Sequence, residues 1–104
     1  MTTIEKWVLA FCLSGWTATA LASEGRDVYK QTCAVCHSAG VPGAPKLGSI
    51  ADWKIRLLVG RQALLHSVLN GHGAMPPKGG DASLSDAQAE AALDYMLSAI
   101  ASSR

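Results

Sequence analysis

Cys33-Ala34-Val35-Cys36-His37 is the segment that decides how the fold of this chain is interpreted, because it places two thiols and an imidazole within five residues. On a helix, Cys33 and Cys36 occupy neighbouring positions of one face. Both sulfurs can therefore reach one flat ligand, and His37 is carried beneath it. This spacing is the attachment signature of c-type haem, in which the sulfurs bind two vinyl groups and the imidazole binds the iron. We therefore expect one covalently attached haem.

The N-terminal segment, residues 1–22, has the pattern of a signal peptide. Lys6 is followed by an apolar run, and Ala20-Leu21-Ala22 is the small-x-small pattern that signal peptidase accepts. Cleavage before Ser23 would deliver residues 23–104 as one monohaem domain, exported to the periplasm, where covalent haem attachment takes place. An uncleaved membrane anchor is the alternative, although the apolar stretch is shorter than the ~20 residues of a spanning helix.

A Cys-x-x-Cys pair also occurs in zinc sites and in thioredoxin-like redox proteins. The number of possible ligands excludes a zinc site. Residues 23–104 contain no cysteine besides Cys33 and Cys36, and His66 and His72 are not spaced as a ligand pair. A thioredoxin-like pair would follow a strand, and no strand-like alternation precedes Cys33. A disulfide reductase without haem stays as a hypothesis that predicts a colourless protein.

Size and charge exclude other classes of function. The 104-residue chain has room for one domain, and nine Lys and Arg against eight Asp and Glu give a net charge of +1. No basic stripe suits nucleic acid. A domain this small has little hydrophobic core, and a buried porphyrin would supply the additional stabilisation that such domains need.

The spacing of apolar residues predicts an all-α fold of about four helices wrapped around the haem, without a strand. The expected helices are residues 23–36, 53–59, 61–69 and one that begins after Ser85. Asp52 is expected to cap the second helix, and Ser85 with Gln88 forms a capping box for the last. The apolar stripe of the last helix is Ala89, Ala92, Leu93, Met96 and Ile100. Glycine and proline in residues 38–50 and 71–84 predict loops around a flat cofactor.

The iron position opposite His37 has two candidate ligands in the second loop. Met75 precedes Pro76, which disfavours helical geometry at the methionine and leaves its thioether in a stiff segment. A thioether is a soft, uncharged ligand that raises the reduction potential. His72 is the competing ligand, and bis-histidine ligation would lower the potential. Met96 belongs to a helix stripe and is interpreted as core filling.

These motifs together resemble the class I c-type cytochromes, and more narrowly the bacterial cytochrome c5 group. The resemblance extends over nearly all of residues 23–98. The residues that carry it are, in chain order, Gly25, Tyr29, Cys33, Cys36, His37, Gly43-Ala44-Pro45-Lys46-Leu47-Gly48, Asn70-Gly71, Gly73-Ala74-Met75-Pro76-Pro77-Lys78-Gly79 and Leu93-Asp94-Tyr95-Met96. Several separate motifs in order are more specific than the attachment signature alone.

The resemblance implies a role for each site residue. Cys33 and Cys36 would hold the haem, and His37 and Met75 would be the axial ligands. The Pro45 carbonyl would accept a hydrogen bond from the free ring nitrogen of His37. Such a bond fixes the tautomer and orientation of a ligating imidazole.

The resemblance also places Gly25 beneath Tyr95, where the first and last helices cross, and Trp53 and Arg56 against the haem propionates. One departure from the family concerns the loop after the methionine. Some relatives have a cysteine pair there, where this chain has Asp81 and Leu84. We therefore expect no disulfide in this loop.

The expected function is one-electron transfer without enzymatic activity, because a six-coordinate His/Met iron leaves no site for a small-molecule substrate. The alternative is a haem enzyme or gas sensor in which Met75 is unbound or leaves easily. Partners are expected to be redox proteins, including membrane redox complexes contacted peripherally, and not nucleic acid. The loops bearing Pro45 and Met75 form the expected docking rim, with Lys46 and Lys78 nearby for weak electrostatic steering.

Overall fold

The attachment motif lies in one helical segment whose winding changes along its length. The computed structural model describes residues 23–103, of which residues 23–28 are α-helical. A π-helical turn, η1 (Tyr29–Cys33), follows, and then α3 (Ala34–His37). The predicted helix over residues 23–36 is confirmed, but the π turn within it was not predicted. Such turns insert an extra residue and are frequent at functional sites.

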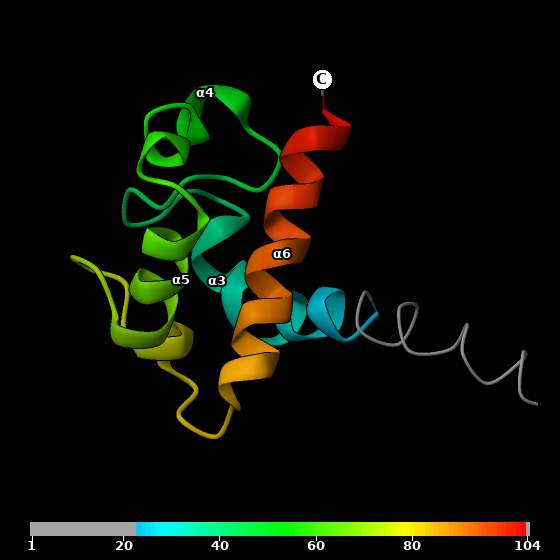
Figure 1. Ribbon diagram of the computed structural model, residues 1–104, viewed down its shortest axis with the longest axis vertical. Coiled ribbons are helices and arrows are strands. Elements are labelled where there is room, and N and C mark those ends of the chain that lie inside the picture. The colour runs from blue at the N-terminus through cyan, green and yellow to red at the C-terminus, as the bar shows by residue number, and fades with distance from the viewer. Residues whose placement is uncertain (1–22, 104) are drawn as a thin grey trace, which may run out of the picture.

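The remaining elements are helices and helical turns, and the prediction of an all-α fold is confirmed for the described residues (Figure 1). They are α4 (Ile50–Trp53), η2 (Arg56–Val59), α5 (Arg61–Asn70), η3 (Pro77–Gly80) and α6 (Asp86–Ser102). The predicted start of α6 is confirmed, with both hydrogen bonds of the Ser85–Gln88 capping box formed. Within residues 23–103, the only bridge of strand type pairs His72 with Met75.

The prediction of one helix over residues 53–59 capped by Asp52 is wrong. Ser49 has an extended backbone, and its hydroxyl accepts the Asp52 backbone N–H at 3.2 Å, so α4 begins one turn earlier. The Asp52 carboxylate instead accepts the backbone N–H of Lys46 at 3.1 Å. The second half of the predicted segment forms the separate turn η2, which ends at Gly60.

The first helix crosses α6 at close range, as Figure 1 shows for the segment before α3. A Cβ added at Gly25 would collide with the carbonyl oxygen of Ala91 and lie 3.4 Å from the Cβ of Tyr95. Four residues later, the rings of Tyr29 and Tyr95 pack at 5.3 Å between centroids. The prediction that Gly25 lies beneath Tyr95 is therefore confirmed. The predicted stripe of α6 is buried at all five positions.

An arginine fixes the start of α5 against α6. Arg61 donates to both carboxylate oxygens of Asp94 at 2.9 Å and to Glu90 at 2.7 Å. The hydrogen bonds to Asp94, which have the largest effect, and to Glu90 raise the pKa of Arg61 above its ordinary value. The contact sets the orientation of the helix that leads into the Met75 loop.

The predicted signal peptide, residues 1–22, lies outside the described residues. Within residues 23–103, none of the helices is sufficiently long and apolar to cross a bilayer.

Candidate functional site

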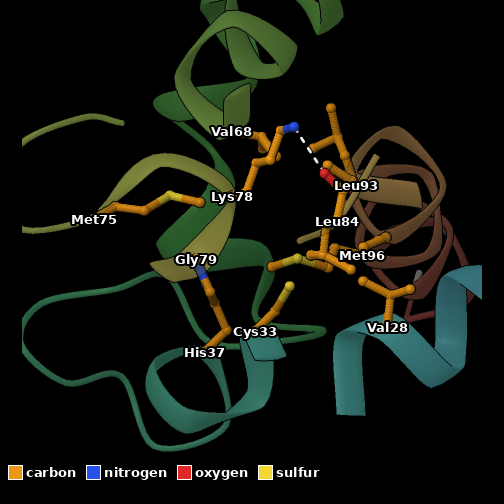
Figure 2. Close-up of a pocket in the computed structure, with 12 residues that line it drawn as sticks. Val28, Cys33, His37, Val68, Met75, Lys78, Gly79, Leu84, Leu93 and Met96 are labelled. Atoms are coloured by element: carbon orange, nitrogen blue, oxygen red, sulfur yellow. Dashed lines mark hydrogen bonds between the residues drawn. The ribbon is translucent and has the colours of Figure 1, made fainter. Parts of the chain in front are cut away.

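An apolar pocket lies between the helical segment of residues 29–37, the loop of residues 71–84 and α6 (Figure 2). It holds about 320 Å³ of space, including its opening to solvent. The residues that line it are Val28, Cys33, His37, Val68, Met75, Lys78, Gly79, Leu84, Ala89, Ala92, Leu93 and Met96. Three predicted site residues, Cys33, His37 and Met75, therefore meet in one pocket although they come from two distant segments.

His37 is the most firmly held side chain of the site. It ends α3, and only 7 % of its surface is exposed. Its Nδ1 lies 2.8 Å from the carbonyl oxygen of Pro45, as predicted. Because a carbonyl only accepts hydrogen bonds, Nδ1 carries the proton and Nε2 keeps its lone pair. The His37 ring is thus prepared to offer Nε2 as a ligand.

Trp53 packs against the His37 ring from outside the pocket. Its ring stacks on that of His37 with 6.2 Å between centroids and 20° between planes, and it is 4 % exposed. Its indole N–H donates to the carbonyl oxygen of Lys46 at 3.0 Å. Neither Trp53 nor Pro45 lines the pocket. Contact of Trp53 with the cofactor stays a prediction, whereas its contact with the His37 ring was missed because no local pattern links residues 37 and 53.

The two cysteines are free thiols in different surroundings. Cys33 lines the pocket, and burial raises its pKa to about 11, so this thiol is protonated at neutral pH. Cys36 is half-buried and lies outside the pocket lining. Their spacing of three residues across the junction of η1 and α3 places both on the side of the helix that carries His37.

Met75 is presented by a two-residue turn. The backbone N–H of His72 donates to the Met75 carbonyl at 2.9 Å, and the Met75 N–H returns the same bond to His72. Gly73 follows His72 with a φ of +57°, a conformation that glycine adopts without strain. Figure 2 shows the Met75 thioether reaching into the pocket, whereas His72 is exposed and does not line it. The arrangement favours Met75 over His72 as the side chain that shares the pocket with His37.

Lys78 ties the Met75 loop to the start of α6. Its ammonium donates to the Leu84 carbonyl at 2.8 Å, drawn dashed in Figure 2, and pairs with Asp86 at 3.0 Å. Steering of redox partners by Lys78 stays a prediction, and the structure weakens it because the side chain is 22 % exposed and its ammonium is paired with Asp86. Sequence reasoning missed this tie, since no spacing rule connects a lysine with a carbonyl six residues later.

The donor set of the pocket fits a haem iron. An imidazole whose Nδ1 is engaged by the Pro45 carbonyl and a thioether face the same space, and no carboxylate is among the lining residues. The walls are aliphatic side chains of the first helix, α5 and α6, as an apolar porphyrin requires. Imidazole and thioether are also the pair of axial ligands that favours a high potential.

Comparison with known proteins agrees with this chemistry. A family model described as cytochrome c oxidase, cbb3-type, subunit III, matches residues 20–96. Cytochrome c-555 of Chlorobaculum tepidum is 39 % identical over 92 residues, which cover 85 % of each chain. Cytochrome c5 of Azotobacter vinelandii is 43 % identical over 77 residues, 72 % of this chain and 93 % of the relative.

A solved structure shows the same fold. The cytochrome c in a crystal structure of an electron transfer complex with nitrite reductase superposes with a TM-score of 0.69 and 47 % identity. The match covers 74 % of this chain and 94 % of that one. The chain therefore belongs to the class I c-type cytochromes, small electron carriers whose cofactor is one covalently attached haem c.

Proposed function

We propose that this protein is an exported one-electron carrier between redox proteins, with His37 and Met75 as the two axial ligands of its haem iron. Bound haem supplies a one-electron couple that leaves both ligands in place. The observation that carries the proposal is that the imidazole and the thioether line one apolar pocket. With both axial positions filled by side chains, no site remains for a substrate, and the protein has no enzymatic activity.

His37 serves as the fixed ligand. Its Nδ1–H donates to Pro45, which directs Nε2 to the metal and increases the basicity of the ring. The stacked Trp53 restricts rotation of the same ring. These contacts would hold the His37 imidazole in one orientation in both oxidation states of a bound haem iron.

Met75 sets the potential. A neutral, soft sulfur stabilises reduced iron, and the aliphatic walls of the pocket disfavour the higher charge of oxidised iron. Both effects raise the reduction potential. A high-potential carrier is the expected result.

A matched pair of variants tests the ligation, because the pocket contains two methionines. Met75→Leu and Met96→Leu each remove a sulfur and keep the volume nearly unchanged. We expect Met75→Leu to lose the weak far-red band of the ferric protein, to lower the potential and to bind carbon monoxide rapidly when reduced. Met96→Leu should keep the band and bind carbon monoxide slowly. A wild-type protein that is high-spin or binds carbon monoxide rapidly would instead indicate a haem enzyme or gas sensor.

We further propose that residues 1–22 are removed on export and that Cys33 and Cys36 form the thioether bonds. Mass spectrometry of the exported protein should give the mass of residues 23–104 plus one haem. A Cys33→Ser/Cys36→Ser variant should lose its haem in denaturing acidic solvent, whereas the wild type keeps it. A retained leader would contradict the proposed domain boundary without affecting the haem assignment.

The partners that we propose are redox proteins. The similar cytochrome c crystallised with nitrite reductase supports this class of partner. Lys46 is exposed beside the loop that holds His37, and in residues 23–103 its side chain forms no ion pair. Lys46→Glu should therefore slow electron exchange with an acidic partner at low salt, and the difference should vanish at high salt.

A further inference from the structure

Three large aliphatic side chains of residues 55–59 are left uncovered by the described chain. Ile55 is 76 % exposed, Leu58 83 % and Val59 62 %, and we call them the aliphatic patch. None of them lines the pocket that contains Cys33, His37 and Met75. Leu57 packs instead against the core cluster that contains Trp53. One side chain thus anchors the turn while three face solvent, and such a group marks an interaction site.

Positive charge borders the aliphatic patch. Lys54 and Arg56 flank Ile55 in the sequence. The Trp53 indole donates a hydrogen bond to the Lys46 carbonyl, which places Lys46 against α4. Among the described residues, none of these three cations pairs with a carboxylate.

The compensating charge near the patch is small. Arg56 donates to the backbone carbonyls of Asp52 and Gly43, and no carboxylate of residues 23–103 pairs with it. Asp52 is the single acidic residue within residues 46–59, against three basic ones. The segment is therefore apolar at its centre and cationic at its border.

We propose that the aliphatic patch and its bordering cations dock the protein onto an anionic lipid surface. Apolar side chains that enter the headgroup region, with Lys and Arg beside them, are the two elements of peripheral membrane binding. Protein interfaces instead concentrate their energy in Trp, Tyr and Arg, while Leu and Val are under-represented among such residues. The patch consists of aliphatic side chains alone, which favours lipid over protein.

The position of the patch fits this role. In Figure 1, α4 lies at one end of the domain, and the yellow segment that follows α5 lies toward the other end. A protein held to a bilayer through the α4–η2 segment would leave the Met75 loop free to face a redox partner. Docking would keep the carrier near membrane redox proteins without a spanning segment.

Binding of the exported holoprotein to lipid vesicles tests the proposal. The protein is purified without detergent, its N-terminus is identified by mass, and it is sedimented with vesicles of phosphatidylcholine alone or of phosphatidylcholine and phosphatidylglycerol in equal parts. We expect binding to the anionic vesicles at low salt and at least tenfold weaker binding to the neutral ones. Ile55→Gln/Leu58→Gln should reduce binding to anionic vesicles at least tenfold, and Lys54→Gln about fivefold.

Control variants match each change elsewhere on the surface. Val41→Gln alters another exposed aliphatic side chain, and Lys30→Gln removes another unpaired exposed lysine; both should bind vesicles as the wild type does. All variants should keep the wild-type haem spectrum, because the changed side chains lie outside the pocket lining. The vesicle test is thus independent of the proposed His37/Met75 ligation.

Two results would overturn the proposal: absence of binding of the wild-type protein to anionic vesicles, and unchanged binding of the Ile55→Gln/Leu58→Gln variant. Absence of lipid binding could be accompanied by self-association of the wild type that the variant loses, or by slower electron exchange of the variant with a protein partner. The patch would then be a protein interface.

Discussion

Replacement of Lys78 tests how the Met75 loop is held. Lys78→Met removes the ammonium and keeps most of the aliphatic stem that lines the pocket. The variant loses the 2.8 Å hydrogen bond to the Leu84 carbonyl and the 3.0 Å ion pair with Asp86. Both contacts join the loop of residues 71–84 to the start of α6, so their loss should loosen this loop first.

The size of the effect follows from the two contacts. A hydrogen bond with a charged donor contributes about 1.5–3 kcal/mol when it is shielded from water. The ion pair adds well under 1 kcal/mol, because the Asp86 side chain is 76 % exposed. We expect Lys78→Met to destabilise the closed loop by about 2 kcal/mol, roughly a thirtyfold change in the ratio of open to closed forms.

Two further variants separate the contributions. Asp86→Asn removes the ion pair and keeps the carbonyl bond, so its effect should stay below about 1 kcal/mol. Lys78→Gly loses the tie but relieves a φ of +53°, which costs a residue with a side chain about 1 kcal/mol. Its stability should therefore lie between those of Lys78→Met and the wild type.

Guanidinium titration of the ferric holoprotein measures these effects with two signals. The far-red band would report the proposed bond between Met75 and the iron, and far-ultraviolet circular dichroism reports the helices. In Lys78→Met the band should disappear at a lower denaturant concentration than in the wild type, and before the helices unfold. A band midpoint equal to that of the wild type would refute the reasoning, because the loop would then be held by other contacts.

Three other substitutions probe the packing around the pocket. Gly25→Ala should lower stability by about 1–3 kcal/mol in thermal unfolding, because the methyl group meets the Ala91 carbonyl, and an unchanged melting temperature would contradict the close crossing. Burial raises the pKa of Tyr29 above 10.0, so the folded state loses stability as pH rises beyond that value. Between pH 9 and 11, about one unit either side of the ordinary tyrosine pKa, the melting temperature of Tyr29→Phe should fall less with pH than that of the wild type. Equal slopes would exclude this cause. Trp53→Phe loses the indole hydrogen bond to Lys46 and should cost about 1 kcal/mol in denaturant titration; no loss would show that this bond contributes little.

The sequence predicts those parts of the fold that local chemistry determines. The start of α6 follows from a serine and a glutamine three residues apart, and its buried face follows from apolar spacing. The helix with the attachment motif follows from the thiol spacing itself. These features depend on contacts within one or two turns, which neighbouring residues specify.

The features that were not predicted depend on segments that meet only in the folded chain. Ser49 and Asp52 are both good capping residues, and the choice between them follows from the contact of Asp52 with the Lys46 backbone. The stacking of Trp53 on His37 and the bond of Lys78 to a carbonyl are of the same kind. The sequence predicted the pocket's donor atoms, whereas the contacts that hold them required the structure.

The two proposed ligands are held by unequal amounts of structure. His37 is fixed by α3, by the Pro45 carbonyl and by the Trp53 ring, and it is almost fully buried. Met75 is presented by one two-residue turn in a loop whose tie to α6 is Lys78. Under denaturant or heat, the methionine side of the site should therefore open first. If His37 and Met75 are the two ligands, as we propose, opening of the loop of residues 71–84 would limit the range of conditions in which the protein transfers electrons rapidly.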